Sequence, residues 1–361
     1  MKILILANYD LGLYNFRKEL LFRLIEQGHK VYISLPYGEK VTPLVDKGCI
    51  FIDTPVDRRG INPLTDFKLF LIYTRLIKKV KPDYVITYTI KPNIYGSLAA
   101  RLKRVPTIST ITGLGSAFQQ QSLLKSIISL LYKTALRKTK KVLFENQANL
   151  QVFVDNKIID SKQAFLLPGA GVNLQEFQYT QLNDETKCRF LFMGRIMQEK
   201  GVDELFYAAE RLKNEYAAVE IDVLGFFEEN YKTIVESLSN REIINFYGFQ
   251  TDVKKYIEKS HCVVLPSYHE GMSNTLLESA AMGRPIITSN INGCKEALID
   301  GETGFLCSVR DEEDLYEKMK HFVQLSQEQK VSMGKSARLH MENNFDREAV
   351  VTKVISLLKP L

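Results

Sequence analysis

Short apolar runs and helical patterns alternate along almost the whole chain. The series opens with a strand-like run at 2–7, an amphipathic pattern at 16–30 and a second strand-like run at 30–36, and the same unit recurs at 83–112. Strands that alternate with helices of this length form βαβ units, in which helices cover both faces of a parallel sheet. The pattern therefore predicts an α/β fold.

A second series of the same kind begins near residue 187 and predicts a second domain. Its expected strands lie at 187–194, 218–225, 244–248, 261–267 and 285–289, and its expected helices at 202–215, 230–239, 251–260, 275–283 and 311–325. Between the two series, Pro168 and two nearby glycines interrupt the periodicity. We predict two doubly wound domains, 1–167 and 168–345, with a C-terminal helix at 346–361 that packs back on the first domain.

The apolar runs are short, which bears on membranes. None approaches eighteen residues, so we expect no transmembrane helix. The N-terminal run has only five apolar residues and no small-residue cleavage site after it. We therefore interpret it as a buried first strand rather than a signal peptide.

The first candidate site follows the strand in VVLPSYHEG, where a buried run ends in a polar turn. The next helix, from SNTLLESAAMG, has Ser273 or Asn274 as its cap. In an open α/β sheet, ligands collect at the carboxyl ends of strands, where helix N-termini point. The free N–H groups around Gly271, Met272, Ser273 and Asn274 then form an anion site, and Gly271 lets a phosphate approach the backbone.

Two carboxylates flank this turn. Glu278 lies about two turns beyond Gly271, roughly 9–10 Å along the helix axis, a span that suits a diphosphate and a ribose. In this interpretation Glu278 accepts hydrogen bonds from ribose hydroxyls, and Glu270 faces a group beyond the phosphates. The alternative is that Glu270 interacts favourably with the helix dipole while Glu278 lies on a solvated face. The spacing alone leaves both interpretations open.

The second candidate site is GRIMQEKG, residues 194–201. A predicted strand ends at Gly194, Arg195 and Lys200 follow within a short loop, and Gly201 precedes a helix. An Arg fork and a Lys point charge suit a diphosphate, although isolated loop charges are commonly only solvated. Since both halves of a diphosphate site fall in one predicted domain, we favour the binding interpretation.

At this point the motifs resemble a known family over nearly the whole chain. The sequence is similar to family-4 retaining glycosyltransferases of the GT-B fold, through Glu270 and Glu278 with PSYHEG, GRIMQEKG, PGAGVNLQEF (168–177) and NGCKEALIDGETGFL (292–306). NYDLGLYNFRKEL (8–20), TIKPNIYG (89–96) and TGLGSAF (112–118) resemble a branch of bacterial capsule, O-antigen and protein-glycan enzymes. These enzymes add an N-acetylhexosamine to a sugar on undecaprenyl diphosphate.

The resemblance implies a fold and a set of donor contacts. Two Rossmann-like domains would face a cleft, with an N-terminal acceptor-binding domain and a C-terminal nucleotide-sugar-binding domain. Arg195 and Lys200 would hold the donor diphosphate, helped by backbone donors from Gly12 and from Met272–Asn274. Glu270 would contact the donor sugar and orient its anomeric carbon.

The resemblance also implies a ribose contact from Glu278 and a nucleobase position near Phe249. One departure matters, because many relatives carry a histidine near the reacting centre of the first domain, and residues 30–260 contain none. Thr112 or Lys91 could fill that space. The acceptor-side candidates are Asn15, Lys91, Thr112 and Gly113.

Positive charge is concentrated in the first half of the chain. Residues 1–180 hold 26 Lys and Arg against 13 Asp and Glu, a net of +13, whereas the rest of the chain has a net of −7. The densest basic run lies at 133–141, beside a stripe of Leu123, Ile127, Leu130 and Leu131 that could be core-facing. We expect a peripheral attachment to the anionic inner face of the cell membrane, and no nucleic acid, since no nucleic-acid motif appears.

Cysteines and acidic residues point away from a metal. Five scattered cysteines without CxxC spacing suggest buried thiols in a reducing cytoplasm. The acidic run at 311–314 opens a predicted helix, and no DxD pair accompanies the donor site. We expect no metal and no cofactor beyond the UDP-sugar substrate.

The resemblance therefore implies retaining transfer of a sugar from a UDP-sugar to a polyprenyl-diphosphate-linked sugar, with other polysaccharide-assembly enzymes as candidate partners. No residue stands out as a protein nucleophile, so the leaving phosphate oxygen is the candidate acceptor of the proton. The alternatives are another GT-B enzyme, such as an epimerase or phosphorylase, and a non-catalytic nucleotide-sugar-binding protein.

Overall fold

A computed structural model describes residues 1–58, 60, 62–114, 123–182 and 187–358 of the chain. The chain forms two compact units: unit 1 is Met1–Ala170 with Glu348–Leu361, and unit 2 is Gly171–Arg347. The predicted joins, after residues 167 and 345, lie close to these boundaries. The predicted Gly115–Phe118 part of the TGLGSAF motif lies outside the described residues.

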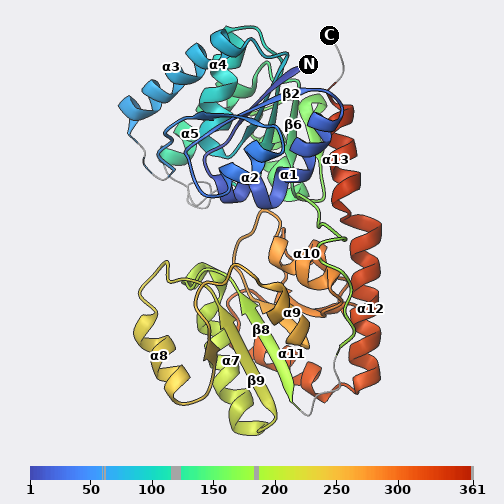
Figure 1. Cartoon of the computed structure of the whole chain (residues 1–361). Helices are drawn as coiled ribbons and strands as arrows, with labels where there is room; N and C mark the ends of the chain where they lie inside the picture. The colour runs from blue at the N-terminus through green and yellow to red at the C-terminus, as the bar shows by residue number, and fades with distance from the viewer. Residues whose placement is uncertain (59, 61, 115–122, 183–186, 359–361) are drawn as a thin grey trace. The chain divides into compact units, whose positions relative to one another are not determined.

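Unit 1 is built on a seven-stranded parallel sheet with the order β3-β2-β1-β4-β5-β6-β7 (Figure 1). Its strands are β1 Lys2–Leu6, β2 Lys30–Leu35, β3 Ile50–Asp53, β4 Tyr84–Tyr88, β5 Thr107–Ile111, β6 Lys141–Phe144 and β7 Ala164–Leu166. The direction of strand order reverses between β1 and β4. In sheets of this type, that switch point is where ligands bind, outside the carboxyl ends of the strands.

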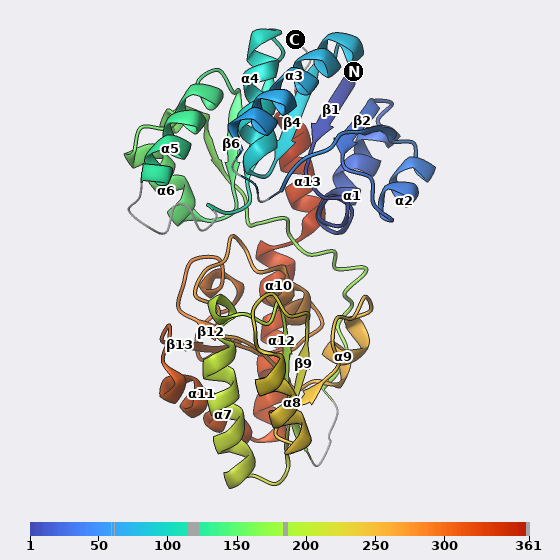
Figure 2. The same ribbon diagram turned by 90° about the vertical axis from the view of Figure 1, so that its left-hand side faces the viewer.

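The pleat of β1 distributes the helices over the two faces of this sheet. Ile3 and Ile5 face a core that contains α1 and α13, whereas Leu4 and Leu6 face α3 and α4 (Figure 2). The helical segments are α1 Asp10–Glu26, α2 Val41–Asp46, α3 Pro63–Val80, η1 Pro92–Gly96, α4 Ser97–Leu102, α5 Leu123–Leu136, α6 Gln147–Asp155, η3 Ser161–Gln163 and α13 Arg347–Ser356. The predicted C-terminal helix is thus confirmed as part of the core of unit 1.

Unit 2 repeats this architecture with a six-stranded parallel sheet of order β10-β9-β8-β11-β12-β13. Its strands are β8 Cys188–Met193, β9 Val219–Leu224, β10 Asn245–Phe246, β11 Cys262–Leu265, β12 Ile286–Ser289 and β13 Gly304–Cys307. Its helical segments are η4 Gln198–Lys200, α7 Val202–Glu215, α8 Lys232–Asn240, α9 Lys254–Lys259, α10 Asn274–Ala281, η5 Lys295–Ala297, α11 Glu312–Gln324 and α12 Gln327–Asn344. The switch point here lies between β8 and β11. The prediction of two doubly wound α/β domains is confirmed.

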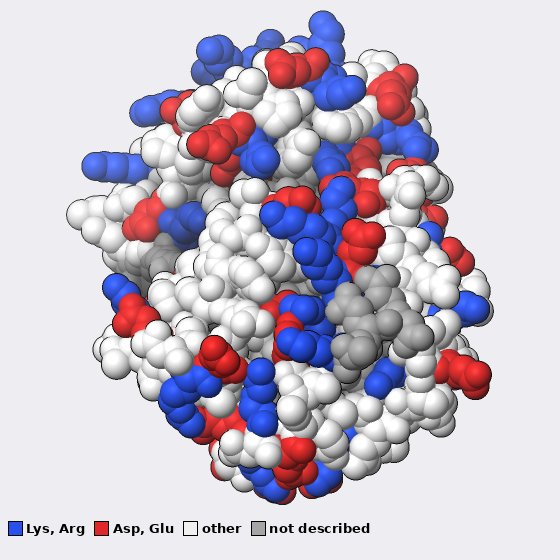
Figure 3. Space-filling view, turned by 60° about the horizontal axis from the view of Figure 1, so that its bottom comes forward, with Lys and Arg blue, Asp and Glu red and all other residues white. Residues whose placement is uncertain are grey.

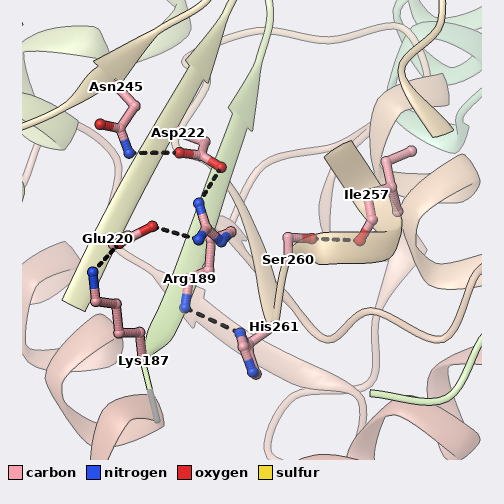
Figure 4. A network of polar contacts seen from close by, with 8 residues as sticks. All are labelled: Lys187, Arg189, Glu220, Asp222, Asn245, Ile257, Ser260 and His261. Carbon is pink, nitrogen blue, oxygen red and sulfur yellow. Dashed lines mark hydrogen bonds and ion pairs between the residues drawn. The ribbon is translucent and has the colours of Figure 1, made fainter. Parts of the chain in front are cut away.

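A polar ladder crosses the strands of unit 2 at a distance from that switch point (Figure 4). Arg189, near the start of β8, forms ion pairs with Glu220 at 2.5 Å and Asp222 at 3.1 Å on β9. Asn245 of β10 donates to Asp222, and the Arg189 backbone N–H donates to Nδ1 of buried His261. The hydrogen bond from Lys187, with the nearby Arg189 guanidinium, lowers the pKa of Glu220. This cluster links strands and is structural.

Three local features differ from the sequence prediction. Helix α1 begins at Asp10 rather than near residue 16, so the loop after β1 is only a few residues long. The predicted helix at 94–104 is a π-helical turn followed by α4. On α5, Ile127 and Leu130 are exposed, whereas Tyr132, Ala135 and Leu136 are buried, so the alternative of a core-facing stripe does not hold for Ile127 and Leu130. The Leu123 side chain is outside the described part of α5.

The five cysteines are unpaired, and four of them are buried, while Cys188 is half-buried. Burial raises the pKa of the Cys49 thiol to about 12 and that of Cys188 to about 11. These thiols behave as small apolar core residues. Among the described residues, no group of three or more His, Cys, Asp or Glu is arranged to hold a metal ion.

Candidate functional site

The candidate site of unit 2 lies at its switch point. The loops after β8 and β11, the two central strands, carry the motifs at 194–201 and 266–273. Gly201 has a φ of +70°, and a Cβ there would lie 2.1 Å from the Pro266 carbonyl oxygen. Only glycine allows this close approach without strain. The two motifs, some seventy residues apart in sequence, are therefore held against each other by their backbones.

This approach pairs two of the predicted site residues. Lys200, at the end of η4, forms an ion pair through Nζ with Oε1 of Glu270, and each side chain is 14% exposed. Ser267 Oγ donates to the same carboxylate oxygen at 3.0 Å. An ammonium has three N–H donors, so the bond to Glu270 leaves two for other acceptors. The pair fixes the position of the amine without using all of its donors.

Arg195 is the second predicted cation of this site. It follows Gly194 at the end of β8, is half-buried, and forms no ion pair with any residue that the structure describes. Buried Arg284, by contrast, donates to the carbonyl oxygens of Ile257, Thr180 and Glu258, and its burial lowers its pKa to about 10. The Arg284 guanidinium is a structural cation, whereas the Arg195 guanidinium remains available to an anion at the sheet edge.

The N-terminus of α10 completes this edge. The Ser273 backbone N–H donates to the Gly293 carbonyl at 2.9 Å, so it is not one of the free donors that the sequence predicted at this turn. Ser273 caps the helix without a side-chain hydrogen bond. Gly293, at φ +89°, packs so closely that a Cβ would lie 2.6 Å from the Gly271 carbonyl oxygen. The NGCKEA motif therefore supports the Glu270–Gly271 turn. In the described structure, Asn274 Oδ1 is buried without a hydrogen-bond partner, as expected of a group that awaits a ligand.

The position of Glu278 needs a correction. Because α10 begins at Asn274, Glu278 lies four residues into the helix, about 6 Å along its axis rather than 9–10 Å. Its side chain is half-buried on this short helix. At this distance from the helix N-terminus, the Glu278 carboxylate can still contact the ribose of a nucleotide whose phosphates lie at the N-terminus.

An aromatic pair lies on the loops after the neighbouring strands β9 and β10. The rings of Phe226 and Phe249 are exposed and lie 6.1 Å apart between centroids in an edge-to-face arrangement. The sequence predicted Phe249 at a nucleobase position but missed Phe226. Exposed aromatic rings offer a flat apolar surface on which a base can stack.

The acceptor-side candidates lie at the carboxyl edge of the unit 1 sheet. Asn15 belongs to the first turns of α1, and so does the donor-side candidate Gly12, which a helix beginning near residue 16 would have left in the preceding loop. The Gly12 backbone N–H is one of the first amides of a helix, which lack partners within the helix. Thr112 and Gly113 directly follow β5. Lys91 is buried, and its Nζ lies 2.7 Å from Oδ1 of Asp66.

Sequence reasoning missed a second buried pair at this edge. Arg17 of α1 binds Glu145, which directly follows β6, at 2.6 Å, and the guanidinium also lies over the Tyr88 ring. Burial raises the pKa of Glu145, and the Arg17 charge opposes that shift. No motif marks these two residues, because they meet only when β6 is placed beside β5.

The basic residues of unit 1 are partly engaged. Lys140 Nζ donates to the Tyr84 hydroxyl, and Lys141 Nζ donates to the Lys162 carbonyl at 2.7 Å. Lys133, Arg137 and Lys138 are exposed. On the face of the molecule that Figure 3 displays, Lys and Arg side chains lie mixed with Asp and Glu and with wide uncharged areas. No helix among the described residues is both long enough and apolar enough to cross a bilayer.

Comparison with known families covers most of the chain. Residues 175–340 match the family model of glycosyl transferases group 1, and residues 2–146 match the model of glycosyl transferase 4-like proteins. The first match contains all the candidate residues of the unit 2 site. The second contains the acceptor-side candidates of unit 1.

Three curated relatives are identical to this chain at about a quarter of the aligned positions. The N,N'-diacetylbacillosaminyl-diphospho-undecaprenol alpha-1,3-N-acetylgalactosaminyltransferase of Campylobacter jejuni is 26% identical over 88% of each chain. The capsular polysaccharide biosynthesis glycosyltransferase CapM of Staphylococcus aureus is 24% identical over 83% of this chain and 82% of its own. The UDP-Gal:alpha-D-GlcNAc-diphosphoundecaprenol alpha-1,3-galactosyltransferase of Escherichia coli is 24% identical over 88% of this chain and 85% of its own.

Solved structures agree on the fold. A glycosyltransferase from Rickettsia africae superimposes with a TM-score of 0.82 at 20% identity, over 100% of this chain and 99% of its own. At this level of identity the likeness speaks for the two-domain architecture.

Proposed function

The chain belongs to the group 1 glycosyltransferases, and on that premise we propose that it moves a sugar from a UDP-sugar to a polyprenyl-diphosphate-linked sugar in bacterial surface polysaccharide synthesis. We further propose that the transferred sugar is an N-acetylhexosamine and that its anomeric configuration is retained. The acceptor class rests on two relatives whose names specify diphospho-undecaprenol acceptors, and the capsule link on a third.

The observation that carries the proposal is the convergence of cationic and amide donors at the unit 2 switch point. Arg195, Lys200 and the first amides of α10 belong to the loops after the two central strands. As the C1–O bond of the donor breaks, negative charge grows on the leaving diphosphate. Donors already in position stabilise that charge without reorganisation, an effect worth about 10²–10³ in rate per donor.

The remaining groups have roles that follow from their positions. Glu278 accepts hydrogen bonds from the ribose, and Phe249 with Phe226 stacks on the base. Glu270, held by Lys200 and Ser267, contacts the hydroxyls of the donor sugar. The leaving phosphate oxygen takes the proton of the acceptor hydroxyl on the face it leaves, so the new bond keeps the configuration of the old one.

A panel assay tests the proposal. The purified chain is incubated with UDP-GalNAc, UDP-GlcNAc, UDP-Gal and UDP-Glc in the presence of polyprenyl-diphosphate-linked mono- and disaccharides, and products are read by mass. We expect one N-acetylhexosamine to be added, and NMR of the product should show the α-anomer of the α-linked donor. Turnover should persist in EDTA, since we propose no required metal. Donor hydrolysis without transfer, or UDP binding without turnover, would replace the proposal by another enzyme class or by a binding protein.

A further inference from the structure

Helices α3, α4 and α5 of unit 1 carry large apolar side chains that do not enter the core. Phe67 is 58% exposed and Leu64 73% on α3, and Leu102 is exposed at the end of α4. On α5, Ile127 is 48% exposed and Leu130 65%. A helix normally turns such residues inward, so their exposure on three helices of one unit calls for a ligand or a partner.

Some of these residues line a cavity, and others do not. The cavity has a volume of about 940 Å³ and lies among α3, the η1–α4 segment and α5. Its apolar walls include Phe67, Phe70, Leu98, Leu102, Ile127 and Leu131. Leu64 and Leu130 are exposed on the same helices but are not among its lining residues. The exposed apolar side chains therefore include the walls of a defined groove.

Charged side chains line the groove at both of its ends, one near each edge of the sheet. Lys91 and Asp66 line it near the carboxyl end of β4, where the Lys91 ammonium is buried and the Tyr95 hydroxyl donates to Asp66 at 3.0 Å. Arg101 and Arg104 line it at the other end, before β5 begins. The groove thus runs past the sheet from the edge that holds Thr112 and Gly113 toward the opposite edge.

We propose that this groove holds the isoprenoid chain of the lipid-linked acceptor, with the acceptor diphosphate at the Lys91 end. The inference rests on the proposed function, because that function supplies the substrate class. An ammonium paired with one carboxylate keeps N–H donors for phosphate oxygens, and apolar walls suit a branched hydrocarbon chain. For transfer, the diphosphate must lie near the carboxyl edge, and Lys91 is the cation of the groove at that edge.

The chain offers a matched pair of variants for the test. Phe67→Ser with Ile127→Ser alters two groove walls, and Leu64→Ser with Leu130→Ser alters two exposed apolar residues on the same two helices outside the groove. All four positions are largely exposed, so both double variants should fold. Thermal melting of each, compared with the unmodified chain, checks this directly.

Binding is measured with dansylated farnesyl diphosphate displaced by geranylgeranyl diphosphate, both below their micellar concentrations. The wall variant should bind about tenfold more weakly, while the control variant stays within about twofold. Geranylgeraniol should displace the probe weakly and inorganic diphosphate hardly at all, because tight binding requires both the isoprenoid chain and the diphosphate. Equal loss in both variants would mean that the probe binds to exposed apolar side chains in general and not to the groove, and would overturn the proposal.

Two further measurements are needed. One distinguishes an isoprenoid diphosphate from a phospholipid as the ligand of the groove, and the other distinguishes failure of the groove proposal from failure of the proposed function. Dioleoylphosphatidylglycerol in bicelles should compete poorly, and competition equal to that of geranylgeranyl diphosphate would reassign the groove to phospholipid. In the transfer assay, the wall variant should lose the preference for a long-chain over a two-isoprene acceptor, through KM rather than kcat. If no acceptor is used even by the unmodified chain, the proposed function fails, while the binding arm still decides whether the groove takes an isoprenoid.

Discussion

We predict that substitutions of Lys200 and Glu270, which form an ion pair, change the affinity for UDP in opposite directions. If Lys200 contacts the diphosphate, Lys200→Ala removes one attractive charge and should weaken UDP binding. Glu270→Gln removes a carboxylate beside the same phosphates and frees the ammonium, so UDP binding should be unchanged or tighter. Both variants should lose turnover, because each removes a group proposed to act on the donor.

The expected sizes follow from the burial of the pair. Each side chain is 14% exposed, so the interaction is neither a surface ion pair, worth about 0–1 kcal/mol, nor a fully buried one, whose breakage costs about 3–5 kcal/mol. A hydrogen bond to a charged group contributes about 1.5–3 kcal/mol, and we expect Lys200→Ala to cost about 2 kcal/mol of unfolding free energy. For a unit of this size that is about 4–8 °C in Tm. Loss of one charge-stabilising donor should lower turnover about 10²–10³-fold.

Three measurements on the same samples test this reasoning: melting with and without UDP, UDP affinity by calorimetry, and transfer rate. Arg241→Ala is the control, because Arg241 and Glu210 form an exposed ion pair of the same unit at 2.6 Å. That variant should melt, bind and turn over like the unmodified chain. Turnover and UDP affinity unchanged by Lys200→Ala would remove Lys200 from the donor site, and weaker UDP binding by Glu270→Gln would refute the proposed division of roles.

Four other predictions extend to the rest of the chain. Glu278→Ala should weaken both UDP and UDP-sugar about tenfold by calorimetry, with uridine following UDP, since a lost ribose contact affects every uridine ligand; unchanged uridine affinity would count against that role. Phe226→Ala should weaken UDP binding two- to tenfold and leave melting unchanged, because its ring is exposed and packs edge-to-face on the exposed Phe249. The chain should sediment with anionic vesicles at low salt and be released as salt rises. Changing the exposed residues Lys133, Arg137 and Lys138 to Ser should reduce sedimentation, whereas Lys140 and Lys141 are left unchanged because both are engaged within unit 1. Acid should destabilise unit 2 through Glu220, because a lowered folded-state pKa contributes stability above the ordinary carboxyl pKa that is lost as the pH falls below about 4, and Glu220→Gln should flatten that part of the melting profile.

The fold was predictable because the buried strands of a parallel sheet are short apolar runs that alternate with amphipathic helices along the sequence. Strands such as β1 and β11 are apolar at nearly every position, and the glycines and polar residues that follow them mark the strand ends. Helix phase was less predictable on α5. Its sequence is apolar on more than one side, so spacing alone did not reveal that Tyr132 and Leu136 are buried while Leu130 is not.

The candidate site was predictable in its parts and not in its pairings. Arg195, Lys200 and Glu270 could be chosen from their loops, but the Lys200–Glu270 contact depends on the approach of Gly201 to the Pro266 carbonyl. Phe226 carries no motif and gains meaning only because β9 lies beside β10. Pairings of this kind arise from sheet order, which local sequence does not contain.

The two switch points use charge differently, and this bears on what each unit binds. In unit 2, Arg195 has no ion-pair partner among the described residues and Lys200 keeps spare donors, so the edge offers positive charge to a diphosphate. In unit 1, the cations at the edge, Arg17 and Lys91, already face the carboxylates of Glu145 and Asp66. The net charge of +13 in residues 1–180 therefore lies mainly on exposed residues away from the edge, such as Lys133, Arg137 and Lys138. At the unit 1 edge the paired Lys91 ammonium keeps N–H donors for the diphosphate of an acceptor, and the exposed basic excess suits attachment to an anionic surface that carries the acceptor.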